Sequence, residues 1–228
     1  SNFHGPSVNH LRSAETVNAK GFENHHQRQY FDSDFTAAYN LTADQGVGVV
    51  ITFFYAPTKG GDFSPGLLGV KVYDKKTIAH KDVTLSANLI LQGATSSYSR
   101  DRGQTLAIKT TPAARYNVPA SRFSLGAWTE AKAYLGAFAG KLFKVYAEPY
   151  VSYQIAPSLS GVVGFEYEAD HFVGTTPFDF STYQHDIVAG VSYMFSPHFI
   201  VNPYVAFYTT EKLSMNNAAL GAIITASL

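Results

Sequence analysis

The sequence predicts an all-β fold, a closed antiparallel transmembrane β-barrel, and three observations carry that prediction. Apolar residues recur at every second position over stretches of ten or more residues, which is the period of a strand with one apolar face. No apolar run approaches the roughly 20 residues that a membrane helix needs. Charged residues make up 15% of the chain, below the roughly 25% of soluble domains. A membrane chain without apolar helices must satisfy its backbone in a closed barrel.

The N-terminal half carries the alternation in six segments. In the second of these, Val47, Val49, Ile51, Phe53 and Tyr55 share one face. The others repeat the pattern with apolar residues outward and small or polar residues inward, as expected of a membrane barrel. The six predicted strands span 30–41, 47–55, 67–75, 83–92, 104–118 and 122–135.

The C-terminal half has the clearest strand, at 143–155. Val145, Val151 and Tyr153 lie on its outward face, and Lys144 and Ser152 lie on the other. Four further strands follow with the same period, at 159–170, 183–195, 199–209 and 217–228.

The alternation therefore predicts eleven strands, whereas single-chain barrels of this kind have an even number of strands. The polar stretch 6–20 supplies the missing strand in a barrel of 12 strands, which we favour. Ten strands is the alternative, if 67–92 has a different register. In domain terms, 1–27 is a polar N-terminal segment that forms the first strand or a lumen plug, and 28–228 is the barrel.

A soluble β-sandwich or lipocalin-like barrel also alternates, but its apolar face points into the core and its outer face is polar. The second face here is rich in Ser, Thr, Gly, Asn and Tyr rather than in charged residues. That composition favours a lipid-facing apolar surface and a polar lumen.

Connection lengths predict an orientation, because membrane barrels pair short periplasmic turns with longer external loops. The short connections are 42–45, 118–121, 156–158 and 196–198. The long ones are 58–64, 94–103, 173–181 and 210–215. The two sets alternate along the chain, as this topology requires.

Strands with aromatic ends, Pro-containing turns such as Ala156-Pro157-Ser158, and a final strand that ends the chain resemble bacterial outer-membrane barrels of the small porin and channel class. The resemblance covers most of residues 28–228 and rests on pattern rather than on a specific motif. The chain departs from the class in ending with Leu228, where such barrels usually end in Phe or Trp. The resemblance implies a bacterial outer-membrane protein in contact with membrane lipid and lipopolysaccharide.

Charged residues predicted to face inward divide into two groups. A basic wall comprises Lys71, Lys109, Arg115, Arg122, Lys132 and Lys144. An acidic wall comprises Asp32, Asp34, Glu166, Glu168, Asp170 and Asp186. Glu130 and Glu148 fall within the basic arc. Opposed walls predict a passive channel for small polar solutes or ions. The alternative is a closed structural or adhesive barrel with charges paired across a packed interior, whose external loops or N-terminal segment bind a partner.

Catalytic and cofactor roles have little support in the sequence. The chain lacks cysteine, which excludes thiolate chemistry and disulfides. An outer-leaflet lipid hydrolase built on His171 and Ser181, with Asp186 nearby, is a distant alternative, because the motifs of such enzymes are absent. Lys+Arg and Asp+Glu balance at 17 each, which gives no indication of a nucleic-acid partner. We expect no enzyme activity, cofactor or metal, and the sequence does not fix an oligomeric state.

Two exposed segments have weaker alternative interpretations. Histidines 4, 10, 25 and 26 lie in the N-terminal segment, which we interpret as polar rather than as a metal site, because their spacing is unlike that of zinc sites. The loop 99–102 carries two arginines, which suit lipopolysaccharide phosphates as well as solvent.

Overall fold

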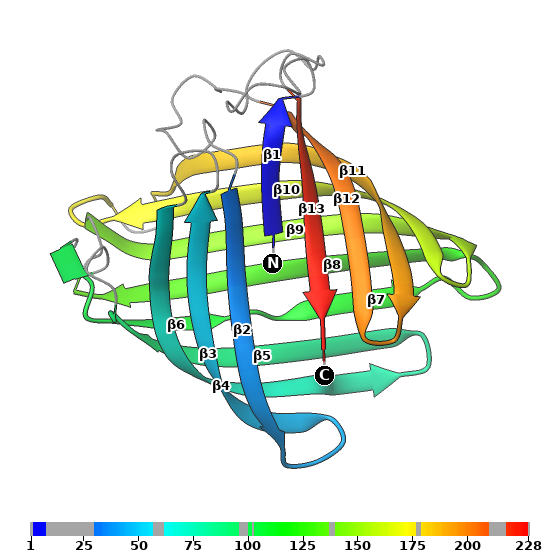
Figure 1. Cartoon of the computed structure of the whole chain (residues 1–228), viewed down its shortest axis with the longest axis horizontal. Coiled ribbons are helices and arrows are strands. Elements are labelled where there is room, and N and C mark those ends of the chain that lie inside the picture. Colours follow the sequence, from blue (N-terminus) through cyan, green and yellow to red (C-terminus); the bar gives the residue numbers. More distant parts are fainter. Residues whose placement is uncertain are drawn as a thin grey trace.

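The structure is a computed structural model that describes residues 2–7, 30–56, 62–95, 100–101, 103–136, 140–176, 179–209 and 218–227. These residues form one antiparallel sheet of 13 strands, which confirms the predicted all-β class (Figure 1). The strands are β1 (Asn2–Ser7), β2 (Tyr30–Asn40), β3 (Gln45–Ala56), β4 (Asp62–His80), β5 (Val83–Gly93), β6 (Leu106–Thr110), β7 (Ala113–Asn117), β8 (Phe123–Leu135), β9 (Lys141–Ala156), β10 (Leu159–Phe172), β11 (Ser181–Ser196), β12 (Phe199–Tyr208) and β13 (Ala218–Ala226). None of the helical turns within the described ranges is long and apolar enough to cross a membrane.

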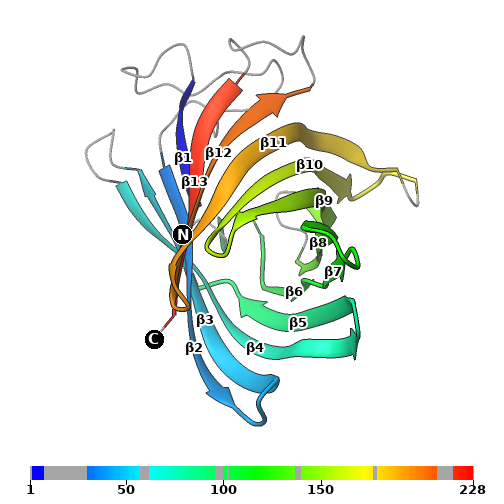
Figure 2. The ribbon, with the colours of Figure 1, turned by 90° about the vertical axis from the view of Figure 1, so that its right-hand side faces the viewer.

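Strand pairing runs in a ring. Neighbouring strands pair in chain order from β1 to β5, and β8 to β13 do the same. Both β6 and β7 lie between β5 and β8. The first and last strands, β1 and β13, pair with each other, so the order of pairing returns to its start (Figures 1 and 2).

The count of 13 strands differs from the predicted 12 at one place in the chain. The single strand predicted at 104–118 is divided into β6 and β7 by Thr111 and Pro112, because proline has no N–H to donate to a strand ladder. Hydrogen bonds to the neighbouring strands satisfy the backbone groups at the break between β6 and β7. Thr111 N donates to Asn88 O at 3.1 Å, and the Pro112 carbonyl accepts from Thr129 N and Thr129 Oγ1, each at 3.0 Å.

The N-terminal strand also differs from its prediction, since β1 begins at Asn2 rather than at residue 6. It pairs with β13 through Asn2↔Ile223 and with β2 through Asn2↔Asp32. Most of the stretch 6–20 lies outside the described residues. At β4 the strand continues to His80, five residues beyond the predicted end at 75, past a register irregularity between Asp74 and Ile78.

Most connections follow the predicted alternation in length, but 57–61, 118–122 and 136–140 are equally long. At one end of the sheet the strands are joined by the short segments 41–44, 81–82, 118–122, 157–158 and 197–198. At the other end, the segments between strands are 8–29, 57–61, 94–105, 136–140, 173–180 and 209–217. The chain enters β1 and leaves β13 at the short-turn end, which follows from the antiparallel order.

Three tyrosine rings lie over glycines of the neighbouring strand. A Cβ added to Gly126 would collide with the Tyr150 ring, and one added to Gly221 would collide with Tyr204. Tyr73 lies in the same way over Gly46. Covering a strand glycine with a cross-strand aromatic ring stabilises sheets that curve strongly.

Gly126→Ala is therefore expected to lower the free energy of unfolding by about 1–3 kcal/mol, because the added methyl group overpacks the Tyr150 ring. The matched control is Gly161→Ala, where the nearest atom to an added Cβ is Ile155 Cδ1 at 3.8 Å. Urea unfolding in lipid vesicles measures both variants. Equal stability of the two would contradict this account of Gly126.

Candidate functional site

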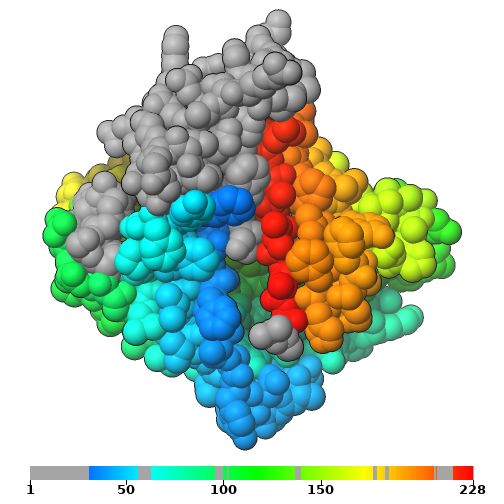
Figure 3. Space-filling view, in the orientation of Figure 1, coloured from blue at the N-terminus to red at the C-terminus, as the bar shows by residue number. Residues whose placement is uncertain are grey.

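The two faces of the sheet have the reverse of the polarity found in soluble proteins. Large apolar side chains are exposed on one face, among them Val47, Val70, Leu89, Ile108, Val163 and Val191. The opposite face buries the polar residues Gln92, Ser124, Asp170 and Asp186. Figure 3 shows the outer face over β2, β3 and β4 in blue to cyan and over β12 and β13 in orange to red. The polar groups of the candidate site thus lie on the concave side of the sheet.

Aromatic residues gather near both ends of the exposed apolar face. At the short-turn end, Phe123 packs on Tyr153 with ring centroids 4.8 Å apart, and Tyr193 packs on Phe195 at 4.5 Å. At the other end, the rings of Phe31 and Tyr55 stack at 6.4 Å. Aromatic girdles on both sides of an aliphatic belt are typical of membrane barrels.

A cluster of ion pairs occupies the inner face toward the long-loop end. Lys109 Nζ lies 2.6 Å from Glu130 Oε2, between β6 and β8, and Lys144 Nζ lies 2.8 Å from Glu168 Oε2, between β9 and β10. Lys141 forms an ion pair with Asp170, whose side chain is only 2% exposed. Every one of these pairs joins neighbouring strands, so the cluster also links the strands laterally.

Lysines continue around the sheet in one register. Lys109 lies opposite Lys132, and Lys132 lies opposite Lys144. Lys132 Nζ lies 5.0 Å from the centre of the Tyr134 ring, close enough for a cation–π interaction. Lys71 stands opposite Ile90, which in turn stands opposite Lys109. The structure therefore brings four of the six predicted basic residues into one belt.

The two acids of β2 face this belt. Asp32 and Asp34 are both exposed, in contrast to Asp170. Asp32 interacts electrostatically with Lys109 of β6 and with Lys144 of β9, although β2 is remote from both strands in the order of pairing. Asp34 interacts electrostatically with Lys71 of β4, which is the next strand but one to β2. The inner face is thus narrow enough at this level for opposite charges to interact across it.

Three carboxylates from neighbouring strands form the middle of the inner face. Glu166 lies in register with Asp186, which is 1% exposed. The Tyr146 hydroxyl contacts Glu166 Oε1 at 2.9 Å and Glu148 Oε2 at 3.1 Å. Trp128 packs edge-on against Tyr146 with ring centroids 4.9 Å apart. Tyr146 thus holds two of the carboxylates together.

The arginines of the predicted basic wall lie apart from the lysines, toward the short-turn end. Arg115 Nε donates to Asn117 Oδ1 and Arg115 Nη2 donates to Ser124 Oγ, each at 3.0 Å. Arg122 lies in the turn before β8, where Nη1 donates to the Ile155 carbonyl at 3.4 Å. Arg122 is therefore a residue of the short-turn rim rather than of a strand.

Lys141 is an ion-pairing residue that the alternation missed. By strict alternation it shares the outward parity of Phe143, and the predicted strand began only at 143. A register shift between His171 and Phe172 changes which side chains face inward at this strand end. Tyr146 was placed on the inner face by the alternation, but its two carboxylate partners depend on the pairing of β9 with β10.

Among the described residues, neither the candidate histidines nor the arginine loop joins the cluster of ion pairs. His171 Nδ1 lies 2.9 Å from Asp179 O and 3.1 Å from Thr175 Oγ1, so its described partners do not include Ser181. Histidines 10, 25 and 26, and the side chain of His4, lie outside the described residues. Of the loop 99–102, Arg100 donates to Thr95 O at 2.7 Å. Within the described ranges, no group of three His, Asp or Glu residues could hold a metal ion.

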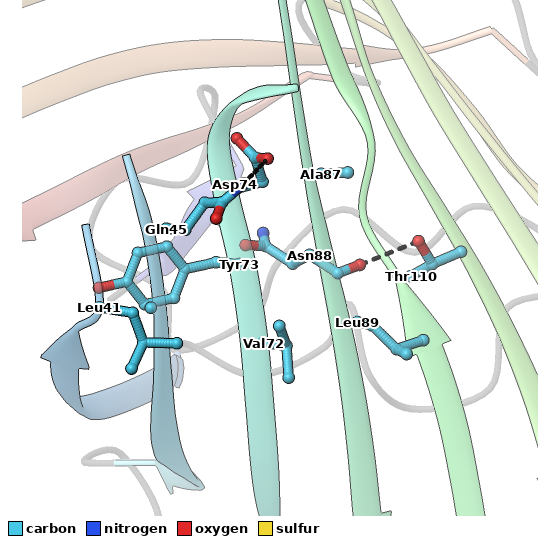
Figure 4. A pocket seen from close by; sticks show the side chains of 10 residues that line it. Leu41, Gln45, Val72, Tyr73, Asp74, Ala87, Asn88, Leu89 and Thr110 are labelled. Atoms are coloured by element: carbon cyan, nitrogen blue, oxygen red, sulfur yellow. Dashed lines mark hydrogen bonds between the residues drawn. The ribbon is translucent and has the colours of Figure 1, made fainter. Parts of the chain in front are cut away.

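Among the described residues, two of the cavities bear on this arrangement. One, of about 400 Å³, lies over β3 to β6 near the short-turn end, and Leu41, Val72 and Leu89 of the exposed apolar face line it (Figure 4). At its edge Gln45 Nε2 donates to Asp74 Oδ2 at 2.8 Å. The other, of about 330 Å³, lies against the inner face between β7 and β13.

Lys109→Met is expected to lower the free energy of unfolding by about 2 kcal/mol, because it leaves the largely buried Glu130 carboxylate without its ion partner. Adding Glu130→Gln should recover part of that loss. Urea unfolding of the single and double variants provides the double-mutant cycle. Strict additivity of the two changes would show that the pair contributes nothing.

Comparison with known proteins gives a likeness of fold. No family model matches the sequence, and no curated protein matches it. Among solved structures, an outer membrane channel from Pseudomonas putida F1 is similar with a TM-score of 0.61 over 99% of this chain and 93% of that chain, at 12% identity. OmpF of Salmonella typhi, in a complex with daunomycin, is similar with a TM-score of 0.43 and 11% identity over 98% and 95% of the two chains. The chain therefore shares the all-β fold of an outer membrane channel.

Proposed function

We propose that the chain is a bacterial outer-membrane β-barrel that acts as a passive channel for small polar solutes or ions through a charge-lined lumen. In this proposal β6 and β7 together make one crossing, so 13 strands give 12 crossings. The proposed role requires no cofactor and no catalytic group. The structural likeness to an outer membrane channel supports it.

The single observation that carries the proposal is the reversed polarity of the sheet. Apolar side chains such as Val163, which is 54% exposed, project from a ring whose inner face buries carboxylates. In water that arrangement would expose a large apolar surface, which soluble monomers avoid. In a bilayer the same surface contacts lipid, and the ring leaves no unpaired strand edge in the hydrocarbon.

The proposed lumen has opposite charges on facing sides at its narrow level. Asp32 and Asp34 of β2 lie on one side, with Lys71 of β4 near them, and Lys109 and Lys144 lie on the other. Glu166, Glu168, Asp170 and Asp186 extend the acidic wall, although Glu168 and Asp170 are each paired with a lysine. A transverse field of this kind orients dipolar solutes and sets ion preference.

The proposed orientation places the short turns in the periplasm and the longer connections outside. Both chain ends of the ring then lie on the periplasmic side, and the outer rim contacts lipopolysaccharide. Residues 1–27 supply the first crossing through β1, and 28–228 supply the rest.

Planar-bilayer recording tests the proposal directly. Purified protein added to one chamber should produce discrete conductance steps in potassium chloride. Absence of steps at every voltage, with protein that is folded and inserted, would overturn the channel. That outcome would favour the closed structural or adhesive barrel, whose loops or N-terminal segment bind a partner.

A further inference from the structure

The inner cavity between β7 and β13 has the size of a small-molecule site. Its volume is about 330 Å³, at the lower end of the roughly 300–1,000 Å³ of ligand pockets. Its lining combines one cation, one carboxylate, three aromatic rings and several hydroxyl groups. The residues that matter here are Arg115, Trp128, Glu148, Tyr150, Ser192 and Tyr204.

Arg115 supplies a fixed positive charge to this cavity. One edge of its guanidinium is held by Asn117 and by the buried Ser124, whose hydroxyl also donates to Asn117 Oδ1 at 3.2 Å. No ion pair among the described residues includes Arg115, whereas Lys109, Lys141 and Lys144 each have a carboxylate partner. A positioned guanidinium with neutral partners retains its capacity to bind a carboxylate.

Glu148 supplies the opposite charge at another point of the same lining. The neutral Tyr146 hydroxyl contacts it and also contacts Glu166, and among the described residues no lysine or arginine forms an ion pair with Glu148. Arg115 of β7 lies opposite Gly126 of β8, and Glu148 of β9 lies opposite Trp128 of β8. The β8 partners of the two charged residues are therefore two residues apart, and the Trp128 indole lies at the end nearer Glu148.

Aromatic rings form the walls between these charges. The Tyr150 ring lies over Gly126 and the Tyr204 ring lies over Gly221, so each ring packs closely against a neighbouring strand. Trp128 is fixed edge-on by Tyr146. Such walls provide apolar contact for a short methylene chain, while the charged groups fix the orientation of its ends.

We infer that this cavity is a binding subsite for a small zwitterion, with the solute carboxylate on Arg115 and its ammonium group toward Glu148. The inference rests on the proposed function, because it names the class of solute that the channel would take. A zwitterion is attracted to both Arg115 and Glu148, which favours its binding. A simple anion is attracted to Arg115 but repelled by Glu148.

The experiment uses the indole of Trp128, since it is the only tryptophan in the chain and it lines the cavity. Full-length protein in detergent micelles is titrated with γ-aminobutyrate, and tryptophan fluorescence and calorimetry are both recorded. We expect saturable binding, and Arg115→Gln should weaken it about tenfold, equivalent to about 1.4 kcal/mol. Arg122→Gln is the matched control, because it removes the same charge from the same end but outside the cavity lining.

Glu148→Gln separates a zwitterion site from a simple anion site. This variant should weaken the binding of γ-aminobutyrate but not that of butyrate, which lacks the ammonium group. If the parent protein bound butyrate as tightly as γ-aminobutyrate, that result would overturn the inferred specificity for a zwitterion and would leave a site for simple anions. Equal effects of Arg115→Gln and Arg122→Gln, or no saturable signal by either method, would overturn the subsite altogether.

Failure of this inference is distinguishable from failure of the channel. Binding in micelles is measured without any current, and conductance steps in potassium chloride are measured without any solute. In the bilayer, γ-aminobutyrate should reduce the open-channel current of the parent protein and of Arg122→Gln, with a weaker effect on Arg115→Gln. Steps that the solute never alters would contradict the subsite while leaving the channel intact.

Discussion

Val163→Arg is expected to lower the free energy of unfolding in lipid vesicles by roughly 2 kcal/mol, the size found for arginine on the lipid face of membrane barrels. The physical reason is exposure of Val163 on the apolar face of β10, where the guanidinium would meet hydrocarbon. Val162→Arg, one residue earlier, should cost less than about 1 kcal/mol, because Val162 lines the inner cavity and polar groups are tolerated there.

This pair of variants is matched in residue type, strand and added charge. A soluble protein with the same strand would give the opposite order, since an exposed valine tolerates arginine and a valine on the enclosed face does not. Urea titration of the folded fraction in vesicles measures both variants. Greater loss at position 162 than at 163 would contradict the assignment of the lipid face.

Replacing Asp32 and Asp34 together with asparagine is expected to shift the selectivity of the proposed channel toward anions. Both side chains are exposed on the inner face, where Asp32 interacts electrostatically with Lys109 and Lys144 and Asp34 interacts with Lys71. Loss of their charge should lower the ratio of cation to anion permeability roughly fivefold, equivalent to about 1 kcal/mol for a close charge pair in water. Reversal potentials in a potassium chloride gradient provide the measurement.

The control for that change is the double variant Asp74→Asn with Asp82→Asn. It alters net charge equally, but Asp74 bonds Gln45 at the edge of the outer cavity and Asp82 lies in the turn between β4 and β5. Its reversal potential should stay near that of the parent protein. An equal shift in both double variants would show that net charge, rather than position in the lumen, sets the selectivity.

The sequence was informative where period-two alternation is strong. The strands around 143–155 and 159–170 correspond to β9 and β10, and their predicted outward apolar positions are exposed or half-buried in the structure except Ala169, which is buried beside a register shift between Glu168 and Ala169. It was uninformative for β1, whose residues Asn2–Ser7 include glycine and proline and show no alternation. Pairing with β13 and β2 determines that strand, since β propensity depends strongly on neighbours.

The candidate site was predictable as a set of inward charges but not as a set of partners. Lys144 lies in register with Asp170, yet its ion pair is with Glu168. Asp170 pairs instead with Lys141, whose orientation depends on a register shift at the end of β10. Partner choice thus depends on lateral register and on bulges, and a single sequence carries neither directly.

Cysteine accessibility along β10 tests the central claim most directly, because the chain has no cysteine of its own. Single cysteines from residue 160 to 167, in protein reconstituted into vesicles, are reacted with a water-soluble maleimide and separately probed by a lipid-soluble quencher. The account predicts strict alternation, with residues 160, 162 and 164 reactive in water and residues 161, 163 and 165 quenched from the lipid. Uniform reactivity along the strand, or alternation in the opposite phase, would contradict a lipid-facing apolar surface around a polar lumen.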